Sequence, residues 1–501
     1  MRQVSSFLRR EQRALAERPP LPRALNEECG VFGIIGHDGP AAPIVALGLH
    51  ALQHRGQEAA GIITHSEDGF HADRQLGLVA DHFHAEEVLA KLPGRAGIGH
   101  TRYSTAGDGN LRNVQPLFAE VDRGGIAVAH NGNLTNNTLL RRELISKGSI
   151  FHTSSDSELF VQLTALSRGI TLADKVIDAA RTVEGAFALT VLTANHLIGV
   201  RDPVGIRPLV LGRLGDAYVL SSESCAFDLI GAEFVRDVEP GEVVICGADG
   251  SLTSRRLTAE GQRPRPCIFE LIYFARPNSF VDGESVYDLR KRLGRTLAEE
   301  APVEADCISP IPDSGVPAAI GFAQASGVPY EMALIRSHYS GRTFIQPDQK
   351  VREKGVARKH SANPGVVKGK RVVLVDDSLV RGTTSTKIIQ MMREAGAKEV
   401  HLRIACPPII YPDFYGIDTP SQKELMAASH SVEEMRREIG ADSLAFLSLD
   451  GLYRALGKGP RDGDAPAFTD HCFTGDYPTA LRDQEAPSSE RHAQLSLLRE
   501  A

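Results

Sequence analysis

Two adjacent carboxylates, Asp376 and Asp377, follow directly on an apolar run that is suited to a buried strand. Val372–Val375 contains no polar residue, which is typical of a strand covered on both faces. Carboxylates at the carboxyl end of such a strand can bind the hydroxyls of a ribose, or a Mg²⁺ ion beside a pyrophosphate. The alternative is an ordinary strand end with acidic turn residues.

Small residues follow the acid pair. We predict a helix over Ser385–Ala395, so that Arg381, Gly382, Thr383 and Thr384 form the loop at its N-terminus. Free backbone N–H groups and hydroxyls at such a position bind phosphate. The order of apolar run, acid pair and Gly-Thr-Thr favours a phosphate site. It resembles the phosphoribosyl pyrophosphate (PRPP) loop of type I phosphoribosyltransferases.

A second candidate centre is the cysteine that opens the strand predicted at 29–35. A cysteine in such a strand is usually part of the core, which is our interpretation of Cys225, Cys246 and Cys307. Cys29 differs because of the motifs that follow it. They are HRGQE at 54–58, HTRYST at 100–105, HNGN at 130–133 and SDSE at 155–158. Together they resemble the class II glutamine amidotransferase domain, an N-terminal-nucleophile hydrolase, over about residues 29–255.

This resemblance implies that the thiolate of Cys29 attacks the side-chain amide of glutamine. If Cys29 is the first residue of the mature chain, its own α-amine, with a pKa of ~7.7–8.0, can accept the thiol proton. We therefore interpret residues 1–28 as a removable leader. They are polar and arginine-rich and lack the apolar core of a secretory signal, and their four glutamates weigh against an organelle transit peptide.

The same resemblance assigns four further roles. The side-chain amide of Asn131 and the backbone N–H of Gly132 would bind the tetrahedral oxyanion. Arg102 would pair with the α-carboxylate of glutamine, and Asp156 with its α-ammonium group. Simpler alternatives exist, because Arg102 and Asp156 can form surface ion pairs and Asn131-Gly132 is a strong hairpin turn. The complete set favours the glutamine site.

Beyond residue 255 the chain resembles the amidophosphoribosyltransferase family, in PIPDSGVPAAIG, SGRTFIQP, VVLVDDSLVRGTTS and FYGID. Such enzymes hydrolyse glutamine and transfer the ammonia to C1 of PRPP, giving 5-phosphoribosylamine and pyrophosphate in the first step of de novo purine biosynthesis. The family pattern places Ser314 with Asp376 and Asp377 at a Mg²⁺ site. It also implies a homotetramer that is inhibited by purine nucleotides.

A polar, cation-rich insertion occupies residues 337–370, between two predicted strands, and includes Arg342 and Lys354. Insertions of this length within a compact domain are usually functional or disordered. We predict a lid that closes over the pyrophosphate, excludes water and neutralises charge. The alternative is a solvated loop.

Some members of the family hold a [4Fe–4S] cluster on four cysteines. The corresponding positions here are Cys267, Asp413, Thr469 and Cys472. Only two thiolates remain, although Asp413 and a neighbour of Cys472 could replace the others, and such clusters depend on thiolate ligation. Alternatively, Asp413 and His471 form a hydrogen-bonded pair without metal. We favour this second interpretation, because hard oxygen ligands do not replace soft sulfur.

The elements that must position these residues fall into two groups. Short strands, with helices near 136–147 and 155–183, predict a layered α+β (αββα) domain of N-terminal-nucleophile hydrolase type at 29–255. Alternating strands and helices predict an α/β phosphoribosyltransferase domain with a parallel sheet at 256–460. In it we expect a strand at 332–335 and helix-like segments at 422–429, 431–439 and 444–456. Residues 461–501 form a tail.

Composition excludes several classes of protein. A chain of 501 residues is too long for one core, and 42% hydrophobic with 24% charged residues is typical of a soluble globular protein. A net charge of −7 argues against a nucleic-acid surface. No apolar run approaches the ~20 residues of a membrane span. Seven scattered cysteines suit a reducing cytosol, which predicts a cytoplasmic enzyme.

Two rival functions fit parts of the pattern. A class II amidotransferase with another synthase, such as asparagine or glucosamine-phosphate synthase, would not need the PRPP loop. A PRPP-sensing regulator would not need an intact glutamine site, and the sequence contains no DNA-binding module. Release of pyrophosphate that depends on both glutamine and PRPP separates the three functions.

Overall fold

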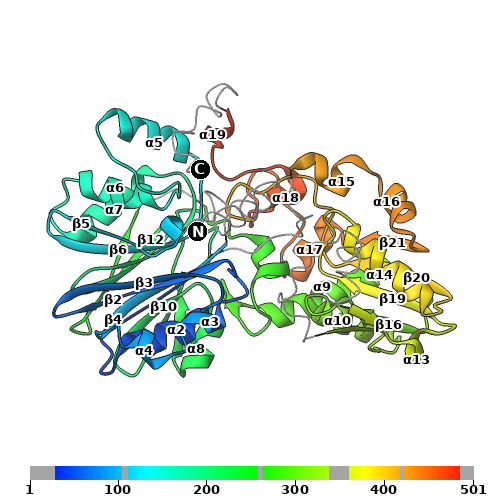
Figure 1. Cartoon of the computed structure of the whole chain (residues 1–501). Coiled ribbons are helices and arrows are strands. Elements are labelled where there is room, and N and C mark those ends of the chain that lie inside the picture. Colours follow the sequence, from blue (N-terminus) through cyan, green and yellow to red (C-terminus); the bar gives the residue numbers. More distant parts are fainter. Residues whose placement is uncertain are drawn as a thin grey trace, which may run out of the picture.

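The computed structural model describes residues 29–103, 111–257, 263–337, 360–417, 419 and 421–485. The predicted leader at 1–28 and the lid residues Arg342 and Lys354 lie outside these ranges. Figure 1 shows an N-terminal part built from two large sheets beside a C-terminal part with a smaller sheet. No helix in the described ranges is long and apolar enough to cross a membrane.

The first sheet is antiparallel, with the strand order β11-β9-β10-β1-β4-β2-β3. Strand β1 lies at its centre and is fully buried, as expected for a strand of small and β-branched residues that is covered on both faces. The strands are β1 (Gly30–Ile35), β2 (Ala59–Ser66), β3 (Gly69–Leu76), β4 (Ala96–Arg102), β9 (Val210–Leu214), β10 (Ala217–Ser221) and β11 (Glu233–Asp237).

The second sheet is also antiparallel and has the order β13-β12-β8-β7-β6-β5. Strand β6, which carries the HNGN motif, pairs with β7, the buried run at 185–192. The strands are β5 (Leu117–Val121), β6 (Gly124–Leu134), β7 (Gly185–Leu192), β8 (His196–Arg201), β12 (Glu242–Gly247) and β13 (Leu252–Arg256).

The two sheets stack through one apolar layer, and each has helices on its outer face. Side chains such as Val31, Ile98 and Leu220 from the first sheet pack with Ala129 and Val244 from the second. Helices α2 (Ala41–Ala51) and α8 (Cys225–Ile230) cover the first sheet, and α6 (Glu158–Leu166) and α7 (Leu172–Thr182) cover the second. The predicted αββα layering is confirmed.

The C-terminal part contains a parallel sheet in the order β16-β19-β20-β21, as predicted. Its strands are β16 (Cys307–Pro310), β19 (Arg371–Asp376), β20 (Glu399–Ile404) and β21 (Ser443–Phe446). Helices α9 (Val286–Glu300) and α10 (Val316–Ser326) pack together against β16 and β19, while α14 (Thr383–Glu394) and α16 (Val432–Ile439) pack against β20 and β21.

The connections place a change of winding direction between β16 and β19. After β16 and α10 the chain returns to the outer side of β16, where Tyr330 forms a parallel bridge with Ile308. The chain then crosses to β19 on the other side of β16. In open α/β sheets, ligands bind outside the carboxyl ends of the strands at such a point. The predicted PRPP residues follow β16 and β19, so they lie at this point.

Two predicted elements were wrong. The strand expected at 332–335 is not in the parallel sheet; β17 (Leu334–Arg336) instead pairs antiparallel with β18 (His360–Ala362). The segment expected as a helix at 444–456 begins as strand β21, and only then does α17 (Leu449–Ala455) start, capped by the Ser448 hydroxyl. The apolar run at the start of this segment was too short for its hydrophobic period to distinguish a strand from a helix.

The C-terminal segment returns to the N-terminal domain. After α18 (His471–Thr474), helix α19 (Arg482–Glu485) lies beside α5 (Asn137–Ser146), as Figure 1 shows. Asp483 accepts a hydrogen bond from the backbone N–H of Thr138 at 2.8 Å, in the first turn of α5. The N-cap residue of α5 makes no capping bond of its own, so the segment supplies one from elsewhere in the chain.

Candidate functional site

Cys29 lies immediately before β1, and the pairing of β1 with β4 places it beside the HTRYST motif. In this register Gly30 faces Thr101, so Arg102 and Tyr103 lie next to the cysteine. The Cys29 thiol points to the carbonyl oxygen of Tyr103, with a distance of 3.5 Å from Sγ. Ser104 and Thr105 of the motif lie outside the described ranges.

The surroundings of Cys29 oppose ionisation of its thiol. Burial raises the pKa of Cys29 to about 11, and the charge of Asp156 raises it further, while Arg102 and Arg55 lower it. These three side chains therefore act on the sulfur from different elements. Arg102 and Asp156 are both almost completely buried, so the alternative that they form surface ion pairs is wrong.

Asn131 and Gly132 lie in β6, on the sheet that faces β1. The Asn131 side chain is fully buried, and within the described ranges neither its oxygen nor its nitrogen has a hydrogen-bond partner. A buried amide without a partner is costly, and it fits a donor that is kept for a ligand. Gly132 continues the strand with a φ of 140°, so Asn131-Gly132 is part of a strand and not a hairpin turn.

Asp156 is held as a carboxylate by its neighbours. The backbone N–H of Leu134 donates to Oδ2 at 3.0 Å, and Nδ1 of His130 lies 3.7 Å from Oδ1. Burial favours the neutral acid, but His130, Leu134 and Arg141 together lower the pKa of Asp156 below its ordinary value. An ionised carboxylate in a buried site is suited to an ammonium group.

Sequence reasoning missed a buried network of charges behind Cys29. Nε of Arg55 donates to the carbonyl oxygen of Cys29 at 3.1 Å, and its Nη atoms lie 2.6 Å from Glu223 and 2.6 Å from Glu270. Arg207 lies 3.2 Å from the same Glu270. The sequence did contain an indication of this network. Glu270 is a lone acid in the apolar segment IFELIYF, and buried charges are rare unless they are paired.

The PRPP residues gather at the carboxyl ends of β16 and β19. Asp376 ends β19, Asp377 follows it, and Ser314 lies in the turn between β16 and α10. Burial raises the pKa of both carboxyls, and the charge of Asp377 raises that of Asp376 further, while Ser314 and Ser378 partly offset the effect at Asp377. Such a pair favours a bound cation that would neutralise the shared charge.

The loop after the acid pair is shaped by Gly382. Its φ is +75°, and a Cβ at this position would lie 2.6 Å from Sδ of Met426, so both the conformation and the space require glycine. Helix α14 starts directly afterwards, two residues earlier than predicted, with Thr383 and Thr384 exposed in its first turn. Arg381 pairs with Glu424 at 2.8 Å.

One buried segment lies between the two sites. It is the π-helical turn Glu270–Phe274, whose Glu270 contacts Arg55. At its other end, the guanidinium of Arg290 donates to the carbonyl oxygens of Leu271 and Ala275. Burial lowers the pKa of Arg290 to about 10, and among the nearby acids Asp377 opposes this most strongly. The glutamine site and the acid pair are therefore linked through one short segment.

The positions that correspond to cluster ligands also lie together. Burial raises the pKa of the Cys472 thiol, and the ionisable groups that add to this effect include Cys267 and Asp413. Nε2 of His471 lies 2.8 Å from Oδ2 of Asp413, with both side chains buried, so the two residues lie within ion-pair distance, but the contact does not have the geometry of the predicted hydrogen bond. In the part of the chain that the structure describes, no group of three or more His, Cys, Asp or Glu is arranged to hold a metal ion.

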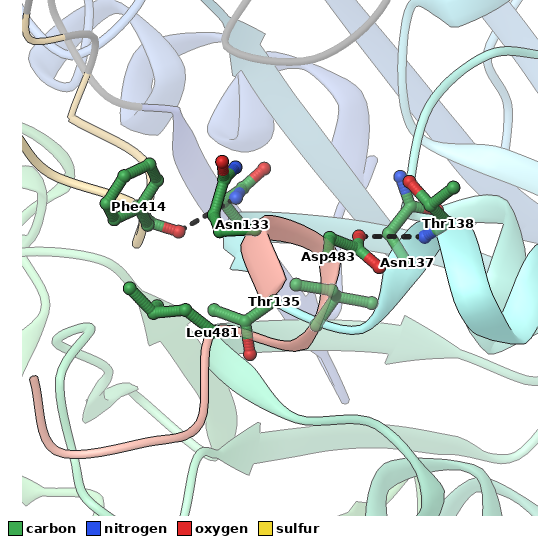
Figure 2. A pocket seen from close by; sticks show the side chains of 9 residues that line it. Asn133, Thr135, Asn137, Thr138, Phe414, Leu481 and Asp483 are labelled. Atoms are coloured by element: carbon green, nitrogen blue, oxygen red, sulfur yellow. Dashed lines mark hydrogen bonds between the residues drawn. The ribbon is translucent and has the colours of Figure 1, made fainter. Parts of the chain in front are cut away.

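A pocket of about 240 Å³ lies where the C-terminal segment meets the N-terminal domain (Figure 2). In it, the side-chain nitrogen of Asn133 donates to the carbonyl oxygen of Phe414 at 2.8 Å. The pocket contains none of the predicted site residues. Its lining is mostly polar and uncharged: Asn133, Leu134, Thr135, Asn137, Thr138, Phe414, Leu481, Asp483 and Gln484.

Comparison with known proteins divides the chain in the same way. A family model described as a glutamine amidotransferase domain matches residues 100–228. A second, described as a phosphoribosyl transferase domain, matches residues 279–412.

Two curated proteins are similar over almost the whole chain. The amidophosphoribosyltransferase of Rhizobium etli is 56% identical over 468 residues, which cover 93% of this chain and 94% of the relative. The amidophosphoribosyltransferase of Bacillus subtilis is 51% identical over 460 residues, which cover 92% of this chain and 96% of the relative.

Solved structures agree with these similarities. The glutamine PRPP amidotransferase of Bacillus subtilis, complexed with ADP and GMP, matches with a TM-score of 0.85 and 49% identity over 90% of this chain and 98% of its own. A structure described as the allosteric regulatory enzyme of purine biosynthesis matches with a TM-score of 0.85 and 50% identity, over 90% and 97% of the two chains.

Proposed function

This chain belongs to the amidophosphoribosyltransferase family, and from that premise we propose which of its residues perform each half of the reaction. The enzyme hydrolyses glutamine and transfers the ammonia to C1 of PRPP, giving 5-phosphoribosylamine, pyrophosphate and glutamate in the first step of purine biosynthesis. The observation that carries the assignment is the convergence of Arg102 and Asp156 on the Cys29 thiol, together with the side-chain amide of Asn131, which has no hydrogen-bond partner among the described residues.

In the glutaminase half, the sulfur of Cys29 attacks the amide carbon of glutamine, and the free α-amine of Cys29 accepts the thiol proton. This role of the amine requires that residues 1–28 are removed. The side-chain N–H of Asn131 and the backbone N–H of Gly132 stabilise the oxyanion. The amine then protonates the leaving ammonia, and water hydrolyses the thioester to glutamate.

Arg102 and Asp156 fix the other end of glutamine. The guanidinium of Arg102 binds the α-carboxylate, and the ionised carboxylate of Asp156 binds the α-ammonium group. Their burial supports these roles, because the exclusion of water strengthens each contact.

In the synthase half, the bond between C1 of PRPP and the pyrophosphate oxygen breaks while the bond to ammonia nitrogen forms. Arg381, Gly382, Thr383 and Thr384 bind a phosphate of PRPP at the N-terminus of α14. The carboxylates of Asp376 and Asp377 bind the ribose hydroxyls. Positioning of the two reactants supplies much of the catalysis.

The acid pair also fits the Mg²⁺ that phosphoribosyltransferases use. Oδ2 of Asp377 is buried and accepts no hydrogen bond from a described residue, and both carboxyls have raised pKa values. Hard oxygen ligands of this kind, with Ser314 nearby, suit Mg²⁺ that is shared with substrate phosphates. When bound, the ion neutralises charge on the pyrophosphate.

We propose that Arg342 and Lys354 belong to a lid that closes over the pyrophosphate. These two residues lie outside the ranges that the structure describes.

An iron–sulfur cluster does not fit the ligands that remain. Oδ1 of Asp413 already accepts two backbone hydrogen bonds, and Oδ2 lies against His471, so this carboxylate is not available to iron. We propose that this chain works without a cluster.

The relatives support a proposal on regulation. The Bacillus subtilis structure is complexed with ADP and GMP, and we propose that purine nucleotides inhibit this enzyme as well. We also propose a cytoplasmic homotetramer. A role as a PRPP-sensing regulator is disfavoured by the complete set of glutamine-site residues, and other synthases are disfavoured by the phosphoribosyltransferase domain.

Replacement of Cys29 by alanine tests the assignment directly. We expect Cys29→Ala to lose glutamine hydrolysis and glutamine-dependent release of pyrophosphate, yet to keep synthesis from added ammonium, because the two sites lie in separate domains. A coupled pyrophosphate assay with glutamine or ammonium chloride measures both. Replacement of the remote buried Cys246 by alanine is the control. Loss of both activities in a folded Cys29→Ala protein would refute the division of roles.

A further inference from the structure

A single carboxylate holds the turn Asp413–Ile417 in the C-terminal domain. Oδ1 of Asp413 accepts hydrogen bonds from the backbone N–H groups of Tyr415 at 2.7 Å and Ile417 at 2.8 Å. From the opposite side, Nε of Arg207 donates to the carbonyl oxygen of Tyr415 at 3.0 Å. Tyr415 is fully buried. The path of the backbone through this turn is therefore fixed by two buried charged groups.

His471 completes the support of the turn. Its Nε2 lies 2.8 Å from Oδ2 of Asp413, and the two side chains are 2% and 1% exposed. The His471 ring also packs edge-on against Tyr415, with ring centroids 5.2 Å apart. Burial raises the pKa of Asp413, but His471 and Arg207 outweigh it, so the pKa lies below its ordinary value. The turn is thus held by an ionised carboxylate.

This turn packs directly on the strand that carries the proposed oxyanion donors. A Cβ on Gly416 would lie 3.2 Å from the carbonyl carbon and 3.3 Å from the Cα of Gly132. One residue along the strand, Asn133 donates to the carbonyl oxygen of Phe414 at 2.8 Å, as Figure 2 shows. Two consecutive residues of β6 are therefore in contact with the turn.

Gly132 also lies against the backbone of β7. A Cβ on Gly132 would lie 2.0 Å from the carbonyl oxygen of Ala186 in β7, and the φ of Gly132 is +140°. Gly132 is therefore enclosed between β7 on one side and Gly416 on the other. Since both neighbours are backbone, a shift of the Asp413–Ile417 turn must be passed on to Gly132.

We propose that Asp413 and His471, through the turn that they hold, are positioning residues for the oxyanion hole of the glutamine site. The C-terminal domain then supplies the outer support of a donor that belongs to the N-terminal domain. A preorganised donor loses much of its effect when it moves by less than 1 Å. The proposal rests on the role of Gly132 given above.

Gly416→Ala tests the contact itself. The added methyl group meets the backbone of Gly132, and the φ of +125° at Gly416 is unfavourable for alanine. Gly69→Ala is the matched control, because Gly69 has a φ of +114° in the β2–β3 hairpin and no atom within 4 Å of the added Cβ. We expect kcat for glutamine hydrolysis to fall about tenfold or more in Gly416→Ala alone, with ammonium-dependent synthesis retained.

Asp413 gives a second, independent pair of variants, which decides the question if Gly416→Ala does not fold. Asp413→Asn keeps an oxygen that can accept from Tyr415 and Ile417, whereas Asp413→Ala removes it. We expect a lower kcat in Asp413→Ala and recovery in Asp413→Asn, with the KM for glutamine changed less than kcat. A purely structural role would instead lower both activities in proportion to the loss of folded protein.

The outcomes separate this proposal from the assignment on which it rests. If Asn131→Ala retains glutamine hydrolysis, the oxyanion site itself is wrong. If Asn131→Ala loses it while Gly416→Ala equals Gly69→Ala, or while Asp413→Ala keeps the kcat of the unaltered enzyme, only the positioning role is overturned. A selective loss of kcat in both Gly416→Ala and Asp413→Ala, or in Asp413→Ala if Gly416→Ala does not fold, supports it.

Discussion

Burial of Cys29 creates a chemical requirement for its reaction. With a pKa of about 11, only about one thiol in ten thousand is ionised at pH 7. Arg102 and Arg55 favour the thiolate but do not offset the exclusion of water. The nucleophile is the thiolate, so a base beside the sulfur is needed. The α-amine of Cys29 can act as this base once the peptide bond to Glu28 is cut. Removal of the leader is therefore a requirement of the proposed mechanism.

Alkylation of Cys29 should reveal this requirement. In chain that retains residues 1–28, we expect iodoacetamide to react slowly with Cys29 at pH 7 and about tenfold faster for each pH unit up to pH 10, because only the thiolate reacts. Chain that begins at Cys29 should react faster at pH 7. Peptide mapping by mass spectrometry follows each site, with Cys246, whose pKa burial raises to about 12, as the slower internal control. A rate independent of pH in uncut chain would contradict the raised pKa.

Among the secondary-structure elements, the strand–loop–helix unit of β19 and α14 was well predicted from the sequence. A continuous apolar run, two acids and a glycine in fixed order predicted a strand, a loop and a helix, and only the first turn of the helix was placed late. Strand β21 was missed because Ser443–Phe446 contains too few residues to show a period. The parallel bridge at Tyr330 depends on the crossover of α10, which no local pattern records.

For the candidate site, too, local motifs could be predicted from the sequence and long-range contacts could not. Motif residues such as Cys29, Asn131 and Asp156 could be proposed from the sequence, because their order along the chain is itself informative. Contacts between domains were not: Gly416 lies against Gly132, and Glu270 against Arg55, across large separations in sequence. Local spacing carries no information on such pairs, and only the lone acid in an apolar segment hinted that a buried partner was needed.

Gly382 tests whether the loop before α14 binds PRPP. We expect Gly382→Ala to raise the KM for PRPP about tenfold or more, because its positive φ is strained and the added methyl group meets Met426. Gly327→Ala is the control, since Gly327 ends α10 with a φ of +72° and open space around it. Steady-state assays with ammonium as nitrogen donor measure the effect. Equal KM values for the two variants would show that the loop conformation does not matter for PRPP.

Across the whole molecule, the two domains are joined by Glu223, a fully buried acid. Oε1 lies 2.6 Å from Nη1 of Arg55 and 2.7 Å from Nε2 of His54, within the N-terminal domain. Oε2 accepts from the backbone N–H of Arg276 at 2.9 Å and from the hydroxyl of Ser279 at 2.7 Å, at the start of the next domain. Both oxygens are thus satisfied, each by a different domain.

The pKa of Glu223 makes this link dependent on pH. Burial raises the pKa, but His54, Arg55 and the N–H of Arg276 lower it well below the ordinary value of 4.5. A carboxyl whose pKa is lower in the folded state stabilises that state fully above its unfolded pKa. The stabilisation is lost as the pH falls from about 4.5 toward the lower pKa of the folded state.

Glu223→Gln keeps the shape of the side chain and removes its charge. We expect the free energy of unfolding at pH 7 to fall by about 3–5 kcal/mol, because the buried guanidinium of Arg55 loses a partner. Below pH 4 the difference from the unaltered chain should shrink, because Glu223 is then increasingly protonated in the unfolded chain while it is still ionised in the folded one. Urea unfolding at the two pH values measures both effects. Glu242→Gln is the control: its partner Arg236 is 37% exposed and lies in the same domain, so the loss should be smaller. A Glu223→Gln chain as stable as Glu242→Gln at pH 7 would mean that Glu223 does not hold the two domains together.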